Sequence, residues 1–512
     1  MKYVKSLFIL LFIILLVFGS ALFRYRTGNI DFKDSDATWH VLLTTKCYDE
    51  TPASQHLFLP LVTMGGEQNK GIPWGMAIAD DVGNYYYISF SPAGFFAPWL
   101  FCKIFGLNVS SASLYLFNNI LFGVSAIILA LLLLSVYEKN QYRYFLVAVG
   151  VLSYLFLPEL LHGMGMVYWN QSVMQVTLLL QIYAYYQCSI NGKKNYRWLF
   201  YVLALINPYI EWTGFVANVG FALSEIIINW KLSRITAVKR VTIIGALTIS
   251  ALVLYFAHFF MRIDQDAFLG TLLLRYGVRD SVGPVSVSQL IGGYYDSFKY
   301  TVIALLGLII WNIVKAGSIR INNLVLLFVC AFPIIENMIM LQHSVQYSYD
   351  RMKAAFILII LLCEVAKNIM EAYKSVYISV VVIAAIALCS VMNFMSYTKD
   401  PSFIWEEDYI ESNAIIADYV TREYPDAVYA ADSDIRGYMD LLFDRGIYEY
   451  QTLESSEMIA DQRGTEQVVY IIKDGTEIIS VLVEDLTTGQ LSMIEECEGS
   501  ICTYEVSRSS WL

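Results

Sequence analysis

Residues 6–23 read SLFILLFIILLVFGSALF, an apolar run without a single charge. A helix needs about 20 predominantly apolar residues to cross a bilayer. The run follows Lys2 and Lys5, exceeds the apolar part of a typical signal peptide, and is not followed by a small-x-small cleavage site after Phe23. We therefore predict that it is a retained first membrane span.

The composition of the whole chain is that of a polytopic membrane protein. Of the 512 residues, 57% are hydrophobic and aromatic residues are as frequent as charged ones at 15%, which lies outside the soluble range. The net charge of −11 is segregated, because residues 397–512 hold 25 acids against 7 bases and the rest of the chain carries +7. Neither part has a dense basic stripe or zinc-type Cys/His spacing, so the sequence argues against a nucleic-acid partner.

Eleven apolar runs are candidate spans. They cover residues 6–23, 112–136, 143–158, 166–187, 197–210, 212–229, 241–260, 299–314, 322–341, 354–366 and 375–396. Short loops rich in Lys and Arg face the cytoplasm. With eleven spans, one side receives Lys2, Lys5, Lys139, Arg143, Lys193, Lys194, Arg197, Lys231, Arg234, Lys239, Arg240, Lys315, Arg320, Lys367 and Lys374.

This charge pattern predicts a cytoplasmic N-terminus and an extracytoplasmic C-terminus, in a multi-pass protein of the plasma membrane. The long loops 24–111 and 261–298 then lie outside, together with the tail. Residues 92–106 are apolar but too short to cross comfortably, which favours a helix along the membrane surface. We predict a membrane domain over residues 1–397 and a soluble acidic domain over residues 398–512.

The tail has the pattern of a small α/β domain. Helical apolar spacing covers residues 406–424 and 433–446, and strand-like runs cover residues 427–431, 467–473 and 477–483. Cys497 and Cys502 flank Glu-Gly-Ser-Ile, a spacing that permits a hairpin disulfide outside the cytoplasm. The sequence leaves open whether they form one.

The first loop concentrates carboxylates just outside the first span. Asp31, Asp34 and Asp36 precede Trp39 and His40, and Asp36 stands where a short amphipathic helix begins. A carboxylate at a helix N-terminus caps backbone amides and is held in place, where it can take a proton from a hydroxyl. The alternative is a solvated turn with no chemical role.

A second group of charges lies at the outer ends of the ninth and tenth candidate spans. It contains Glu336, His343, Asp350, Arg351 and Lys353. Ionisable groups at membrane depth are costly and often functional, and Arg and Lys can hold a phosphate. The alternative is snorkelling at the interface with an Asp350–Arg351 pair. Arg275 and Arg279 of the middle loop are further phosphate candidates, with solvated loop charges as the alternative.

The order of these features resembles the GT-C superfamily of integral-membrane glycosyltransferases. The likeness rests on Asp36-Ala-Thr-Trp-His40 after the first span, His56-Leu-Phe-Leu-Pro60, Tyr86-Tyr87-Ile-Ser-Phe-Ser-Pro92, and the run through Trp99 to Gly106. It is strongest to the branch of the protein O-mannosyltransferases and the lipid A aminoarabinose transferases, which is glycosyltransferase family 39-like. The motifs cover about the first 140 residues, and topology covers the remainder.

The resemblance implies roles for particular residues. Asp36, with Asp34, matches the first-loop acid that acts as a base or positions the acceptor, while Trp39, His40, Tyr86, Tyr87 and Glu211 become candidates for binding the acceptor or the sugar. Arg351, Lys353, His343, Arg275 and Arg279 become candidates for the donor phosphate.

Two departures from the family pattern leave the need for a divalent metal open. Ala37 stands where relatives have a second acid, and Tyr168-Trp169-Asn170-Gln171 replaces a later acid for which Glu159, His162 or Glu211 could substitute.

The sequence thus predicts a polytopic α-helical protein that transfers a sugar from a polyprenyl-phosphate donor to a glycan, lipid or protein of the cell envelope, with inversion. Two rival functions stay open at this point. A transporter or flippase for lipid-linked saccharides would place charges deep within several spans, whereas the charges here crowd the outer ends. A non-catalytic assembly protein would work through its tail.

Overall fold

The computed structural model of the chain describes residues 2–27, 35–65, 77–165, 168–280, 283–316, 320–399, 409–431, 436–449, 460, 464–474 and 477–507. It divides into two compact units. The helical unit comprises Met1–Lys33, Ser111–Ala257 and Leu273–Ile404, and the second unit comprises Asp34–Ser110, His258–Leu272 and Trp405–Leu512. The second unit therefore joins residues of the first loop to the tail, and the predicted domain division at residue 397 stays a prediction.

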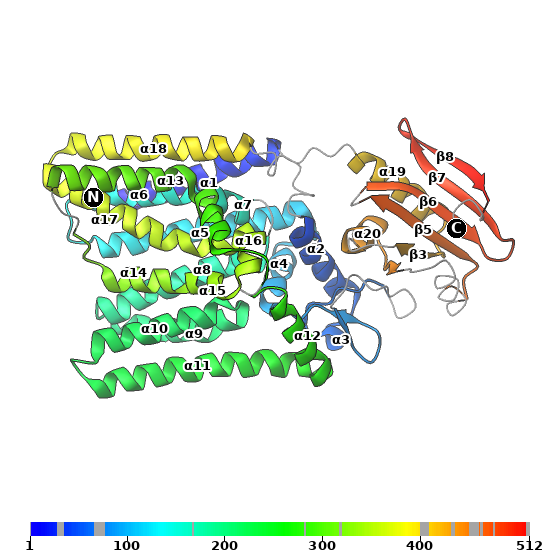
Figure 1. Cartoon of the computed structure of the whole chain (residues 1–512), viewed down its shortest axis with the longest axis horizontal. Coiled ribbons are helices and arrows are strands. Elements are labelled where there is room, and N and C mark those ends of the chain that lie inside the picture. The colour runs from blue at the N-terminus through cyan, green and yellow to red at the C-terminus, as the bar shows by residue number, and fades with distance from the viewer. Residues whose placement is uncertain are drawn as a thin grey trace. The chain divides into compact units, whose positions relative to one another are not determined.

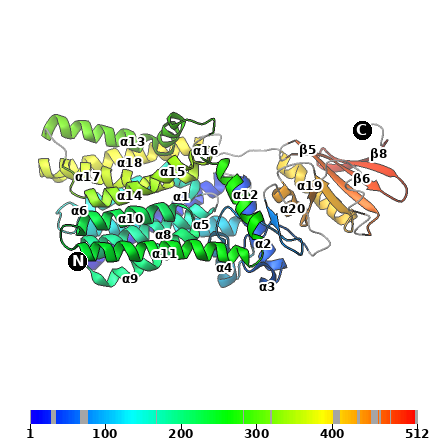
Figure 2. The same cartoon turned by 60° about the horizontal axis from the view of Figure 1, so that its bottom comes forward.

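Each of the eleven predicted spans is mostly helical over its described residues. The helices of the helical unit are α1 (Lys2–Thr27), α5 (Ser111–Val136), α6 (Arg143–Leu155), α7 (Pro158–Gly163), α8 (Asn170–Tyr185), α9 (Arg197–Ile210), α10 (Thr213–Asn229), α11 (Arg234–Phe260), α13 (Val287–Ala316), α14 (Leu324–Ala331), α15 (Ile335–Ile339), α16 (Leu341–Gln346), α17 (Ala355–Tyr373) and α18 (Val376–Lys399). The long helices run side by side (Figures 1 and 2).

Five of the described helices are long and apolar enough to cross a membrane by themselves: α1 from Leu7, α5, α11, α13 to Lys315, and α18. Large apolar side chains stay exposed along their surfaces, as lipid-facing helices require. The predicted span 322–341 is broken into α14, a 3-10 turn at Phe332–Ile334, and α15. Pro333 lies in that turn, where it has no N–H to continue the α-helical ladder.

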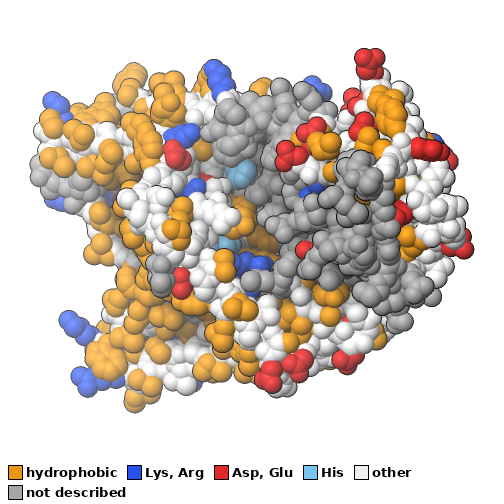
Figure 3. Space-filling view, turned by 45° about the vertical axis from the view of Figure 1, so that its right-hand side comes forward, with side chains coloured by type: hydrophobic (Ala, Val, Ile, Leu, Met, Phe, Trp, Pro, Cys, Tyr) orange, Lys and Arg blue, Asp and Glu red, His pale blue; other side chains and the backbone are white. Residues whose placement is uncertain are grey.

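Charged residues of the helical unit lie at both ends of the bundle. The helix connections on the predicted cytoplasmic side carry the Lys and Arg residues of the short loops, and Lys and Arg side chains stand at the left edge of Figure 3, beyond the hydrophobic surface of the helices. The other end holds α7, the link between α9 and α10, and the segment from α15 to the start of α17. The orientation of the two ends in the membrane stays a prediction.

The predicted middle loop is largely helical. It forms α12 (Gln265–Gly277) and the first part of α13, which breaks at Lys299, where the backbone has φ 29° and ψ −110°. The predicted eighth span begins at this break. Gly292 and Gly293 lie inside the helical part that precedes the break.

In the second unit, the first-loop residues form α2 (Ser35–Glu50), α3 (Ala53–His56), the β1–β2 hairpin (Ile78–Ala79 with Tyr85–Tyr86) and α4 (Pro92–Phe105). Helix α4 corresponds to the predicted surface helix. It begins at Ser91, whose hydroxyl accepts from the Ala93 amide at 3.3 Å, and ends at Gly106, whose φ of 63° terminates the helix.

The tail is an α/β domain, as predicted. Its six-stranded sheet has the order β4-β3-β5-β6-β7-β8. The elements are α19 (Tyr409–Glu423), β3 (Val428–Ala431), α20 (Arg436–Phe443), β4 (Tyr448–Glu449), β5 (Gln467–Asp474), β6 (Glu477–Asp485), β7 (Gln490–Cys497) and β8 (Ser500–Val506). Strand β3 is parallel to β4 and β5, and the remaining pairs are antiparallel. Cys497 and Cys502 are free thiols on the β7–β8 hairpin.

Candidate functional site

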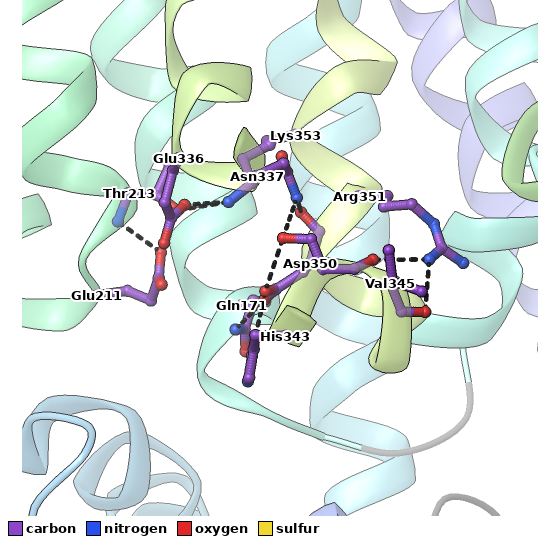
Figure 4. Close-up of polar contacts among 11 residues, drawn as sticks. Gln171, Glu211, Thr213, Glu336, Asn337, His343, Val345, Asp350, Arg351 and Lys353 are labelled. Carbon is purple, nitrogen blue, oxygen red and sulfur yellow. Dashed lines mark hydrogen bonds and ion pairs between the residues drawn. The ribbon is translucent and has the colours of Figure 1, made fainter. Parts of the chain in front are cut away.

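A short 3-10 segment, Ser348–Ala354, brings three charged side chains into the helical unit. Asp350, Arg351 and Lys353 are all buried, with exposed fractions of 3%, 7% and 5%. Neighbouring residues of a 3-10 turn point about 120° apart, whereas residues three apart point the same way. Arg351 therefore points away from Asp350 and Lys353, and Figure 4 shows the partners that each of the three side chains contacts.

Arg351 binds Glu159 through a serine. Its Nε donates to Ser297 Oγ at 2.9 Å, and Ser297 Oγ donates to Glu159 Oε2 at 2.7 Å. Arg351 Nη2 lies 3.8 Å from the same carboxylate oxygen, and Nη1 donates to the Ser344 carbonyl at 2.8 Å. Glu159 lies in the first turn of α7, where the helix dipole stabilises a negative charge.

Asp350 binds His343 and Gln171. Its Oδ2 contacts His343 Nδ1, and its Oδ1 accepts from Gln171 Nε2 at 2.7 Å. The Asn337 amide ties the segment down by donating to the Asp350 carbonyl at 3.2 Å. Burial disfavours the Asp350 carboxylate, but His343 and Lys353 outweigh it and lower the pKa of Asp350. Asp350 is thus a fixed anion, paired with His343 and not with Arg351.

Lys353 binds Glu336 and Thr213. Its Nζ contacts Glu336 Oε2 and donates to Thr213 Oγ1 at 3.0 Å, and Thr213 Oγ1 contacts the same Glu336 oxygen. Glu211, in the link between α9 and α10, accepts from the Thr213 amide at 3.0 Å. Burial, and then the nearby Glu336 carboxylate, raise the pKa of Glu211 to about 8. The raised pKa favours the protonated form of Glu211, which can donate a hydrogen bond as well as accept one.

These contacts have an electrostatic consequence. Each of the predicted phosphate ligands Arg351, Lys353 and His343 already contacts an acid, respectively Glu159, Glu336 and Asp350. The group is a connected polar network in which the positive charges of Arg351 and Lys353 are paired with carboxylates. Among the described side chains, no three of His, Cys, Asp and Glu are arranged to hold a metal ion.

Several polar atoms around this network are buried without hydrogen-bond partners in the described structure. They include Glu159 Oε1, Gln171 Oε1, Asn337 Oδ1 and both amide atoms of Asn170. Leaving a buried polar atom unsatisfied costs about 1–3 kcal/mol, so water or a bound polar group pairs with such atoms in native proteins.

Arg24, at the end of α1, is a residue that the sequence analysis did not single out. It is 3% exposed and donates to Asn119 Oδ1 at 2.9 Å, to the Leu161 carbonyl at 3.4 Å and to the Gly165 carbonyl. No described carboxylate lies within ion-pair distance of it. The only sequence signal was its position, directly after an uncharged span.

The predicted first-loop residues belong to the second unit. Asp34 lies outside the described residues, and Asp36 is in the first turn of α2, with its side chain outside the described part. Trp39 is buried and stacks on Tyr438, with ring centroids 4.2 Å apart. Helix α2 thereby packs on α20 of the tail.

The remaining predicted sugar-binding residues of this unit are also buried. The His40 ring contacts Tyr87 at a centroid distance of 4.2 Å, in an edge-on arrangement. Tyr86 is fully buried, and its hydroxyl donates to Asp80 Oδ2 at 3.0 Å. These side chains hold the loop together. Arg275 and Arg279 lie at and just beyond the end of α12 and are half-buried.

Comparison with solved structures shows the same architecture along nearly the whole chain. ArnT from Cupriavidus metallidurans, crystallised with undecaprenyl phosphate, superposes with a TM-score of 0.53 over 90% of this chain and 93% of that one, at 10% sequence identity. The chain has the GT-C fold. The fold class is therefore confirmed as a polytopic α-helical membrane protein with a C-terminal α/β domain.

Two further GT-C structures come from Archaeoglobus fulgidus. Its oligosaccharyltransferase tethered to an acceptor peptide has a TM-score of 0.51, and AglB in complex with an inhibitory peptide and a dolichol-phosphate has one of 0.50. Each match is 11% identical and covers 90% of this chain and 69% of the other. No protein-family model and no curated protein matches the sequence.

Proposed function

We propose that this protein is a glycosyltransferase of the plasma membrane, which transfers a sugar from a polyprenyl-phosphate donor to a glycan, lipid or protein acceptor on the outer face. The observation that carries this proposal is the tied network of Glu159, Asp350, Arg351, Lys353 and Glu336 at one end of a GT-C helical bundle. Buried ionisable groups in a membrane protein mark functional sites more often than structural ones.

The proposed reaction is a single displacement. The acceptor hydroxyl loses its proton to Asp36, its oxygen bonds to the anomeric carbon, and the bond from that carbon to the phosphate oxygen breaks. The lipid phosphate leaves with the electron pair, and the anomeric configuration inverts. Such a step needs a base at the acceptor and positive charge where the phosphate departs.

The remaining predicted residues receive roles in the same proposal. Arg351, Lys353 and His343, with Arg275 and Arg279 of the middle loop, orient the donor phosphate. Trp39, His40, Tyr86 and Tyr87 shape the loop that presents the acceptor, and Glu211, protonated at neutral pH, hydrogen-bonds the sugar. Asp34 supports the base.

The test compares cells that carry wild type, a deletion, Asp36→Asn, or Asp418→Asn as a matched control. Asp418 is an exposed aspartate on α19. We expect Asp36→Asn to lower transfer about 10²- to 10⁴-fold, the usual contribution of a general base. Mass spectrometry should then show one polyprenyl-phosphate sugar accumulating and one envelope decoration lost, as in the deletion.

Two results would overturn the proposal. If Asp36→Asn behaves as wild type while the deletion has a phenotype, the base is wrongly assigned. If the deletion leaves every lipid-linked sugar and every envelope glycan unchanged, the protein is not a transferase of this kind.

A further inference from the structure

The proposed donor phosphate needs a positive charge that is not already cancelled. Arg351 and Lys353 contact Glu159 and Glu336. Arg24 differs from them, because its described partners are the neutral side chains of Ser20, Asn119, Tyr115 and Tyr397 and the carbonyls of Leu161 and Gly165. A buried guanidinium without an anion is unfavourable in a membrane protein, and binding an anionic group would offset that cost.

An apolar groove runs along α1 and α5 towards this guanidinium. Its volume is about 480 Å³, and α1 and α5 supply all of its described lining, from Ile14 and Ile127 at one end to Tyr25 and Ala112 at the other. Asn119, which accepts a hydrogen bond from Arg24, lines the groove, and the Arg24 guanidinium lies 5.8 Å from the ring centroid of Tyr115, another lining residue.

The groove has the length of one membrane leaflet. At about 1.5 Å per residue, the α1 residues 14–25 span roughly 17 Å, close to half of a hydrocarbon core about 30 Å thick. Gly123 forms part of its wall, and a Cβ at that position would meet only Val17, at 3.8 Å. A larger side chain at position 123 would therefore have room to project into the hollow.

The site also borders the polar network. Both arginines contact α7: Arg351 through Glu159 in its first turn, and Arg24 through the Leu161 carbonyl. A phosphate held by Arg24 would therefore lie beside the network that we propose to orient the donor.

We propose that the α1–α5 groove binds the chain of a polyprenyl phosphate and that Arg24 binds its phosphate. The inference rests on the proposed function, which supplies the lipid carrier. The apolar wall matches a hydrocarbon chain, and the uncompensated cation at its end matches an anionic head group. Arg24 would thus be a donor-binding residue in addition to those that the sequence predicts.

The test measures the polyprenyl phosphate that stays bound when the full chain is purified in mild detergent after incubation with that lipid. Gly123→Leu fills the groove and leaves Arg24 intact. Its matched control is Gly19→Leu on the exposed surface of α1, where a Cβ meets nothing within 4 Å. We expect bound polyprenyl phosphate, quantified by mass spectrometry, to fall about tenfold in Gly123→Leu, the effect of displacing roughly two buried methylene groups.

Arg24→Gln and Arg24→Lys test the head group. We expect Arg24→Gln to lose the part of polyprenyl-phosphate binding that depends on the phosphate, and Arg24→Lys to retain some of it. Because Arg24 also holds carbonyl groups and could be needed for folding, Gly123→Leu decides the result if Arg24→Gln does not fold. The inference is overturned if Gly123→Leu retains as much polyprenyl phosphate as the wild type. It is also overturned if Gly123→Leu loses bound phospholipid but keeps its polyprenyl phosphate.

The outcome is separable from that of the proposed function. If lipid binding depends on the groove but the deletion strain shows no glycan change, the lipid site is supported and the transferase function is rejected. If Asp36→Asn has a glycan defect but lipid binding does not depend on the groove, the transferase function is supported and the lipid site is rejected.

Discussion

At the scale of single residues, Glu211 makes the stability of the protein depend on pH. It is buried near Glu336, Lys353 and Asp350, and its pKa is raised from 4.5 to about 8. The unfolded chain releases this proton near the ordinary pKa, so between these two values the folded state binds more protons. The stabilisation is complete below the ordinary pKa and is lost as the pH rises through about 8.

We therefore expect the thermal midpoint of the purified wild type to fall between about pH 4.5 and pH 8, and that of Glu211→Gln to fall less, because glutamine stays neutral. Glu411→Gln, at an exposed position on α19, is the control and should follow the wild type. Parallel pH profiles for wild type and Glu211→Gln would show that Glu211 is ionised in the folded protein at neutral pH.

The sequence identified several members of the polar network but not their partners. Few ionisable residues lie beside the apolar runs, and such residues often mark a functional site. They include Arg351, Lys353, His343 and Glu211. Their contacts come from distant segments: Glu159 and Ser297 meet Arg351, and Thr213 meets Lys353. Only the packing of helices fixes such pairs, so the sequence could not tell a cation that is free from one already neutralised.

At the scale of elements, the first part of α13 positions Arg351 through a glycine. A Cβ at Gly293 would lie 2.9 Å from Arg351 Nη1 and 3.0 Å from its Cζ, whereas a Cβ at Gly292 would meet nothing within 4 Å. Alanine favours a helix over glycine by about 0.5–1 kcal/mol. Gly292→Ala and Gly293→Ala thus change the helix equally but differ in what they do to the guanidinium.

We expect Gly293→Ala to lower transfer about 10²-fold, the usual effect of a misplacement near 1 Å, because Arg351 must move from Ser297 and Glu159. Gly292→Ala should keep wild-type transfer. Both rates come from an assay with purified protein and a lipid-linked sugar. Equal activity in the two variants would show that Arg351 need not occupy its observed place.

Helices were more predictable than the breaks within them. Apolar length alone located all eleven helical segments, because a lipid-exposed backbone must satisfy its hydrogen bonds internally. The break of α13 at Lys299 coincides with the predicted start of a span, but its backbone geometry follows from packing, since Lys has no preference for φ 29°. The pair Gly292 and Gly293 looks like a turn in the sequence and is helical in the structure. Strands β7 and β8 were missed because their polar residues hide the alternation.

At the scale of the whole molecule, the orientation in the membrane decides which face the site can use. The short basic loops predict that the end of the helical unit with the polar network, and the tail, both lie outside the cytoplasm. The tail carries its own reporters, since Cys497 and Cys502 are half-buried free thiols, whereas Cys389 is half-buried within the apolar helix α18 and the other five cysteines are buried.

We expect a membrane-impermeant maleimide to label the wild type in intact cells, after mild reduction, and to lose that labelling in the Cys497→Ser/Cys502→Ser variant. Adding Lys194→Cys to that variant places a thiol at an exposed position of a basic loop, which should react only after the membrane is permeabilised. The positive-inside rule requires this pattern, because each Lys or Arg left in the cytoplasm avoids the cost of crossing the bilayer. The opposite pattern would place the polar network at the cytoplasmic face, where a donor would have to be used before it crosses the membrane, and the proposed reaction on the outer face would be untenable.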